Sequence, residues 1–401
     1  MASVTQTSTS SGGSTVGQLK LRGHHAALEA ALPDLETKGV GRVALTRRTL
    51  PRSRSTSCAD GVIQFTVVRG VIGRDRAAQY VSRMYQWLEA FGKGFKADDR
   101  STWHIDQMPT FNRRDMGGMK DLLRGVTDAE VSGGLFHRYG VAHEQFAWDI
   151  RSEPAVIDVF ASIWGTEELL VSFDSVNISL PYPKEELEKD NRGGAWPHVD
   201  QSPNRRFKHC VQGIMNLWCL PWCPCPQVWS DHLYQEENGP DDGGLMVLSG
   251  SMPLYGQFFE EHESDAPEGG WSWRDSYHFT NPAHLQWFYD RGCEWIKVEA
   301  EPGDVILWDS RCIHYGAAAR GDRPRVATYV CYKPAKDIEP DMLEKRRQAF
   351  EECMGTSHDP LLFRFTGSKA TGPASPDERM EPLVKPVLSD RAKQLVGILA
   401  Y

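Results

Sequence analysis

The sequence predicts a mainly β domain of the sandwich or jelly-roll class, with helices at its flanks. Five short runs of β-branched and apolar residues lie at 169–173, 210–217, 245–248, 305–308 and 326–330. Segments rich in Gly, Pro, Asn and Asp separate these runs, which is typical of strands joined by turns. A further β-rich run at 64–68 is either a strand or the approach to a helix. Double-stranded β-helix cores belong to this class, so a jelly roll of that kind is the predicted core.

Helical periodicity lies on both sides of the predicted strands. Between residues 76 and 91, large apolar side chains recur at the three- and four-residue spacing of a helix. A second helix is predicted from Ser152, with Glu153 and Pro154 in its first turn and Gly165 as its stop. A charged helical pattern returns at 338–354. Generic core packing is a sufficient explanation of the apolar residues in the first two of these helices.

The composition along the chain suggests four parts. Residues 1–17 are rich in Ser, Thr and Gly, so we expect a flexible tail that buries too little apolar surface to fold. Residues 18–165 form a mixed, helical part that packs on the core, and 166–335 form the jelly-roll core itself. The core range includes the segment 219–237, whose Cys, Pro and Trp content does not fit a barrel strand. Residues 336–401 are expected to form a helix followed by a surface arm.

Charge and composition exclude several classes of partner. The formal net charge of −9 among 401 residues argues against nucleic-acid binding, which requires clustered basic residues. No apolar run is long enough to span a bilayer, so no membrane partner is expected. Nine cysteines and no signal-peptide pattern favour reduced thiols and a cytoplasmic location. The sequence leaves the oligomeric state open and points to a small-molecule substrate.

The candidate metal ligands are His198, Asp200 and His314. Side chains of an extended segment repeat every two residues, so His198 and Asp200 can share one face. A third ligand, His314, comes from a distant strand that follows a Pro-Gly-Asp turn at 302–304. Two imidazoles and one carboxylate form the facial triad that suits Fe(II) and leaves open positions on the metal. A lone His-x-Asp is weak evidence, and the order of all the parts along the chain is what strengthens it.

Arg325 is the candidate carboxylate clamp. It opens the strand predicted at 326–330, whereas Arg320 and Arg323 fall in a Gly- and Pro-containing turn. A guanidinium can hold a carboxylate through two parallel hydrogen bonds. A charge at the mouth of an apolar core is costly without an anion to match it. Arg323 remains the alternative.

These motifs resemble the phytanoyl-CoA dioxygenase family of Fe(II)/2-oxoglutarate-dependent oxygenases, over roughly residues 169–332. The resemblance implies a cupin-like jelly roll, Fe(II) on the triad, 2-oxoglutarate as cosubstrate with its far carboxylate on Arg325, and O2 as oxidant. Met252 stands where the family usually has a histidine, which is not one of the triad ligands. Related halogenases lack the triad carboxylate, so the presence of Asp200 indicates an oxygenase.

The resemblance also implies further contacts to the cosubstrate. Asn216 and Trp218 share a face of the strand after the His-x-Asp loop, where the family often places an aromatic side chain near 2-oxoglutarate. Ser175 and Asn177, on the strand before that loop, are candidates for hydrogen bonds to the same ligand. Ordinary core packing explains these four residues equally well.

The segment 219–237 allows a second interpretation. Cys219, Cys223, Cys225 and His232 offer three thiolates and an imidazole, the ligand types of a structural zinc site. Their spacing matches no standard zinc motif, and the interleaved prolines stiffen the backbone. An insertion that acts as a lid is the plainer expectation.

The sequence therefore predicts an Fe(II)/2-oxoglutarate-dependent dioxygenase that hydroxylates a small molecule, with a natural product as one candidate, and releases succinate and CO2. Desaturation and ring closure use the same residues. No basic cluster suited to the phosphates of coenzyme A is recognisable, so the substrate of the family's namesake is not transferred. Two alternatives remain: a cupin-like isomerase or hydrolase that uses another metal, and a catalytically silent binding barrel.

Overall fold

The structure is a computed structural model, and it describes residues 64–109, 135–181, 195–217, 239, 241–317, 321, 323–373, 376 and 378–401. The expected tail at 1–17, the insertion at 219–237 with its zinc interpretation, and Trp218 lie outside these residues. Within them, no helix is both long and apolar enough to cross a bilayer.

The structure confirms the predicted fold class. Two antiparallel sheets stack face to face: a six-stranded sheet of order β1-β10-β6-β12-β4-β2 and a five-stranded sheet of order β8-β5-β11-β7-β9. Two strand pairs, β13-β3 and β14-β15, lie outside these sheets. The strands are β1 Phe65–Val68, β2 Leu135–Phe136, β3 Leu169–Val171, β4 Val176–Ser179, β5 His198–Val199, β6 Val211–Asn216, β7 Gly244–Ser249, β8 Tyr277–His278, β9 Glu294–Lys297, β10 Val305–Asp309, β11 His314–Ala317, β12 Arg325–Val330, β13 Tyr332–Pro334, β14 Gly355–Thr356 and β15 Phe365–Thr366.

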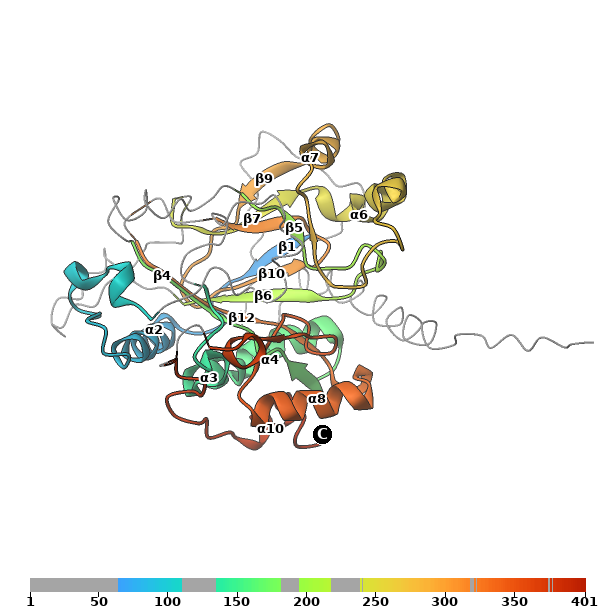
Figure 1. The fold of residues 1–401 in the computed structure, drawn as a ribbon. Helices are drawn as coiled ribbons and strands as arrows, with labels where there is room; N and C mark the ends of the chain where they lie inside the picture. Colours follow the sequence, from blue (N-terminus) through green and yellow to red (C-terminus); the bar gives the residue numbers. More distant parts are fainter. Residues whose placement is uncertain are drawn as a thin grey trace, which may run out of the picture.

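Helices cover the outer face of the six-stranded sheet, and a smaller helical lobe lies on the opposite side of the molecule (Figure 1). The α-helices are α2 Arg74–Glu89, α3 Gln145–Arg151, α4 Pro154–Trp164, α6 Ser251–Glu261, α7 Pro282–Tyr289, α8 Pro340–Glu351, α9 Ser368–Thr371 and α10 Asp390–Val396. The 3₁₀-helices are η1 Arg100–Thr102, η2 Ile105–Gln107, η3 Val141–His143, η4 Glu263–Asp265 and η5 Ala335–Asp337.

Side-chain alternation on the central strands builds two separate apolar layers. On β10, Val305 and Leu307 join the large core shared with the helices, while Ile306 and Trp308 join a core shared with β7. Successive side chains of a strand point to opposite faces, so the six-stranded sheet is buried on both sides. The second layer, between the two sheets, is the one that contains the candidate site.

The helix predicted from Ser152 is observed as α4. Glu153 is its N-cap and Pro154 its first residue, while Gly165 ends it in the left-handed conformation with φ 66°. Gly adopts this conformation without the steric cost that a Cβ brings. The helix packs its apolar side on the outer layer of the six-stranded sheet through residues that include Phe160 and Ile163.

The chain after residue 335 contributes to the core as well as to the surface. Arg346 of α8 is fully buried and donates hydrogen bonds to the carbonyls of Val171, Val396, Leu395 and Pro360. Burial lowers its pKa to about 9. Because one guanidinium joins α8, α10 and β3, the C-terminal segment is tied to the β core.

Candidate metal centre

Two of the three predicted ligands lie on neighbouring strands of the five-stranded sheet. His314 begins β11, and the register pairs it directly with His198 on β5. On its other side His314 pairs with Val247 of β7, which belongs to the apolar layer between the sheets. Directly paired residues of antiparallel strands share a face, so both imidazoles are directed into that layer.

Asp200 follows β5 in a bend and not in the strand itself. The strand is only two residues long, so the alternating segment expected from the sequence is shorter than predicted. Two contacts fix the backbone of Asp200: its N–H donates to the carbonyl of Ser310 at 3.2 Å, and its carbonyl lies 3.1 Å from His358 Nε2. The carboxylate is therefore placed by the turn before β11 and by the C-terminal segment.

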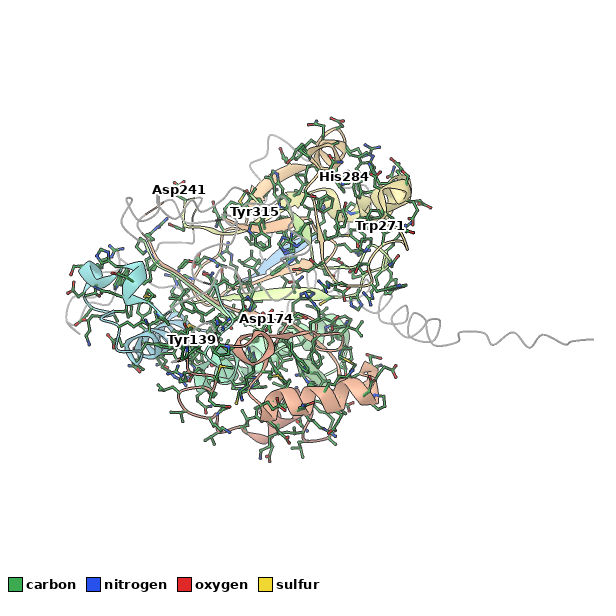
Figure 2. The ribbon with its side chains drawn as sticks, viewed as in Figure 1. Tyr139, Asp174, Asp241, Trp271, His284 and Tyr315 are labelled. Atoms are coloured by element: carbon green, nitrogen blue, oxygen red, sulfur yellow. The ribbon has the colours of Figure 1, made fainter. Side chains whose placement is uncertain are left out.

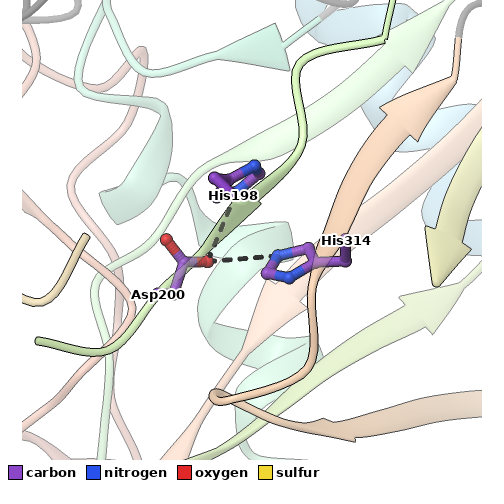
Figure 3. A group of neighbouring side chains, drawn as sticks. All are labelled: His198, Asp200 and His314. Atoms are coloured by element: carbon purple, nitrogen blue, oxygen red, sulfur yellow. Dashed lines mark ion pairs between the residues drawn. The ribbon is translucent and has the colours of Figure 1, made fainter. Parts of the chain in front are cut away.

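The three side chains converge on one point (Figure 3). His314 Nε2 lies 3.3 Å and His198 Nε2 lies 3.7 Å from Asp200 Oδ2, and the two rings are 4.3 Å apart between centroids. The three potential ligand atoms all lie within 4.8 Å of one another. One metal ion can contact all three.

Backbone carbonyls set the tautomer of both histidines. Nδ1 of His198 lies 3.1 Å from the Trp196 carbonyl, and Nδ1 of His314 lies 2.9 Å from the Cys312 carbonyl. A carbonyl oxygen only accepts, so each Nδ1 carries the proton and each Nε2 presents its lone pair to the triad. A second hydrogen bond on the far nitrogen is the usual arrangement of metal-binding histidines.

The electrostatics of the site favour the ligand forms of these groups. Burial, and then the neighbouring His314, lower the pKa of His198 well below its ordinary value, which keeps the imidazole neutral. Burial acts to raise the pKa of Asp200, but His358, His198 and His314 together hold it well below its usual range. A neutral imidazole and an ionised carboxylate are the species that bind a divalent metal.

Two aromatic neighbours of His198 were not predicted as part of the site. The Trp196 indole stacks on the His198 ring at 4.1 Å with an interplanar angle of 6°. His278 pairs with His198 through β8, and its ring lies 5.4 Å from that of His198 and 6.2 Å from that of Trp196. No Pro-Gly-Asp turn precedes His278, so nothing in the neighbouring sequence marks it as part of the site. Only the strand pairing places it here.

Gln212 is a second residue that sequence reasoning missed. Its Nε2 donates to Asp200 Oδ2 at 3.0 Å, and it is buried on β6 opposite Trp308. It lies four residues before Asn216 on the same face of β6, a spacing that was available in the sequence. Gln212 on β6 of the six-stranded sheet thus binds the carboxylate of Asp200, which follows β5 of the five-stranded sheet.

We expect Gln212→Leu to weaken iron binding by about 10–100-fold, the usual effect of removing an outer partner of a metal ligand. Iron affinity is measured anaerobically by competition with a chromogenic chelator. Gln257→Leu, at an exposed position on α6, is the matched control and should bind iron like the wild type. Equal affinities for the two variants would show that Gln212 does not position Asp200.

The two candidate arginines, Arg323 and Arg325, differ in their side-chain partners. Arg323 forms an ion pair with the buried carboxylate of Asp242, with Nη2 2.5 Å from Oδ2 and Nε 2.7 Å from Oδ1. Arg325 is itself buried at the start of β12, and no side-chain hydrogen bond or ion pair joins its guanidinium to another residue in the described part of the chain. The Asp242 carboxylate thus already neutralises Arg323, which leaves Arg325 as the candidate for the clamp.

Arg325 faces the layer between the sheets from the strand opposite the triad. It shares a face of β12 with Ala327, which packs in that layer. A second cation lies nearby, because burial and then Arg325 lower the pKa of Lys297 to about 8. Two neighbouring cations favour the binding of an anion at this end of the site.

Of the other residues predicted to contact the cosubstrate, two already have protein partners and one has an unpaired donor in the described chain. Asn216 donates through Nδ2 to the carbonyls of Ala300 and Glu301, so its amide nitrogen holds the turn before β10. Ser175 lies just before β4 and donates to Asp174 Oδ1 at 3.0 Å. Asn177 differs, because its Nδ2 is buried without a partner in the described chain and the residue pairs with Ala327. Asn177 is thus a donor available to a ligand.

Fold and site together define a jelly-roll protein with a two-histidine, one-carboxylate candidate metal site. The family model for phytanoyl-CoA dioxygenase (PhyH) matches residues 225–327, which contain His314 and Arg325 but not the His-x-Asp pair. "Ava biosynthesis cluster protein O" of Aspergillus versicolor is 34% identical over 295 residues, covering 73% of this chain and 82% of that protein. The chain belongs to the phytanoyl-CoA dioxygenase family.

A more distant relative and a solved structure are also similar to this chain. A Dictyostelium discoideum protein described as a candidate phytanoyl-CoA dioxygenase is 19% identical over 330 residues, which is 74% of this chain and 79% of its own. Among solved structures, a candidate oxidoreductase from Salmonella typhimurium LT2 superposes with a TM-score of 0.51 at 13% identity, covering 96% and 93% of the two chains. At that identity the structural likeness supports the fold alone.

Proposed function

We propose that this protein is an Fe(II)/2-oxoglutarate-dependent oxygenase acting on a small molecule. The observation that carries the proposal is the pair of imidazoles whose Nε2 atoms meet the Asp200 carboxylate, each oriented by a backbone carbonyl. This donor set fits Fe(II) and leaves coordination positions free. His198, Asp200 and His314 are the residues that hold the metal.

Arg325 is the residue that binds the far carboxylate of 2-oxoglutarate. Its burial without a protein counter-ion in the described chain is costly unless an anion is bound, and the nearby Lys297 adds to the positive potential. Asn177 Nδ2 offers a further buried donor to a ligand in the same layer. Bound iron and 2-oxoglutarate supply the activation of O2 that oxidises a substrate C–H bond, with release of succinate and CO2.

The surrounding protein keeps the reacting groups oriented and water away from them. Trp196 and His278 both pack against His198. On the other imidazole, the Trp308 ring lies 5.3 Å from that of His314, and its Nε1 is buried with no partner among the described residues. This indole N–H and Asn177 are the donors that a polar group of the substrate or cosubstrate would meet.

The substrate class rests on the relative from Aspergillus versicolor, whose name assigns it to a biosynthesis cluster. We therefore propose a natural-product intermediate as substrate and hydroxylation as the default outcome. A screen of such compounds scored by succinate release tests both parts of the proposal. Wild type should release succinate above its uncoupled rate with a true substrate, and His314→Ala should release none. Iron-loaded wild type that never consumes 2-oxoglutarate would favour an isomerase, a hydrolase or a silent binding barrel.

A further inference from the structure

A second group of side chains that could hold a metal ion lies in the helical lobe, on three different elements. His262 ends α6, Asp265 lies in η4, and His284 lies in the first turn of α7. One potential ligand atom from each lies within 4.8 Å of the other two. Figure 2 shows His284 in this lobe, which stands apart from the six-stranded sheet.

Nε2 is the potential metal-binding nitrogen of each imidazole. His262 Nδ1 lies 2.8 Å from the Phe258 carbonyl, so it carries the proton and leaves Nε2 as the ligand atom. His284 Nδ1 lies 3.1 Å from the Tyr277 hydroxyl, and its Nε2 lies 3.0 Å from Asp265 Oδ2. Ligands about 2.0–2.1 Å from a tetrahedral Zn²⁺ are separated by about 3.3 Å. The 3.0 Å between His284 Nε2 and Asp265 Oδ2 would therefore have to increase only slightly for both atoms to bind one Zn²⁺.

The rings themselves are held in place by packing. His262 stacks on Phe258 at 4.2 Å, and its edge meets Trp287 at 5.9 Å. His284 meets the same Phe258 ring edge-on at 5.2 Å. Side chains that are already fixed lose little entropy when they bind an ion, which raises the affinity of a site.

The charge of Asp265 distinguishes this group from a histidine–carboxylate group in the core, which consists of His209, Asp275 and Asp359. In that group, Asp359 binds the Lys333 ammonium and Asp275 binds Arg205, so protein cations already neutralise both carboxylates. Asp265 accepts only from His284 among the described residues, and its side chain is 43% exposed. It retains lone pairs for a cation that arrives from solvent.

We propose that His262, Asp265 and His284 form a structural Zn²⁺ site, with water in the fourth position. Bound zinc joins α6, η4 and α7. Through the Tyr277 hydroxyl it also supports β8, which pairs with the strand that carries His198. The ion thus stabilises the lobe that backs the metal centre, and it takes no part in the oxidation.

Zinc binding by the full-length protein tests the site. We expect Asp265→Asn and His262→Gln each to lose one equivalent of Zn²⁺ relative to wild type in equilibrium dialysis. Any zinc held by the triad is common to all these proteins and cancels in the comparison. Glu260→Gln, an exposed acid one residue before the end of α6, is the matched control and should retain the full stoichiometry.

A second measurement separates metal binding from a simple ion pair. In the His314→Ala background, where the triad is disabled, added Zn²⁺ should raise the Tm. Further substitution of Asp265 by Asn should abolish that rise. The proposal is overturned if Asp265→Asn and His262→Gln bind as much zinc as wild type, or if the zinc-dependent rise in Tm persists without Asp265. Neither result depends on 2-oxoglutarate turnover, so the test is independent of the proposed function.

Discussion

His314→Ala is expected to reduce bound iron from about one Fe(II) per chain to almost none. The substitution leaves only His198 and Asp200 as protein ligands, and it removes the imidazole nearest to Asp200 Oδ2. A facial triad that loses one of its three ligands no longer holds the metal against solvent. Iron per folded chain is measured after anaerobic reconstitution and removal of excess metal.

His278→Ala is the matched control for this loss. His278 is an imidazole of the same sheet that stacks on His198, but it does not belong to the group of ligand atoms that meet at Asp200. It should retain close to one Fe(II) per chain. Full iron in His314→Ala, or equal loss in both variants, would contradict the assignment of the triad.

Arg325→Leu is expected to weaken 2-oxoglutarate binding by roughly thirtyfold to several thousandfold, equivalent to about 2–5 kcal/mol. The reason is that the far carboxylate would lose its partner in a layer from which water is excluded. Arg325→Lys should lie between wild type and Arg325→Leu, because lysine keeps the charge but not the two-pronged hydrogen bond. Binding is measured anaerobically on the iron-loaded protein.

Arg323→Leu is not a clean comparison for this variant. It would leave Asp242 buried without its cation, so any loss of binding would combine with a loss of stability. Lys336→Leu, which removes an exposed positive charge from η5, is the better control and should change affinity little. A similar affinity for Arg325→Leu and Lys336→Leu would place the carboxylate clamp elsewhere.

The sequence was sufficient to predict the central strands because each combines β-branched residues with turn signals at both ends. The runs at 210–217, 305–308 and 326–330 are observed as β6, β10 and β12, within two residues at each end. The helical lobe of α6 and α7 was not predicted. Its helices are short and aromatic, and their burial depends on a core with Phe258, Phe259 and Phe288 that only the tertiary fold assembles.

The sequence was also sufficient to name the candidate metal ligands, but not the residues that surround them. His198, Asp200, His314 and Arg325 follow one another in an order that the family resemblance makes specific. Gln212, His278 and His358 reach the site from separate strands and from the C-terminal segment. Their roles depend on register and long-range packing, which a single sequence does not encode in any local pattern.

The visible spectrum of the iron-loaded protein under anaerobic conditions tests the central claim most directly. Addition of 2-oxoglutarate to the Fe(II) form should produce the charge-transfer band of a chelated 2-oxo acid in wild type, and no band in His314→Ala. A wild-type protein that binds Fe(II) but shows no band at saturating 2-oxoglutarate, or a full-strength band in His314→Ala, would contradict the account.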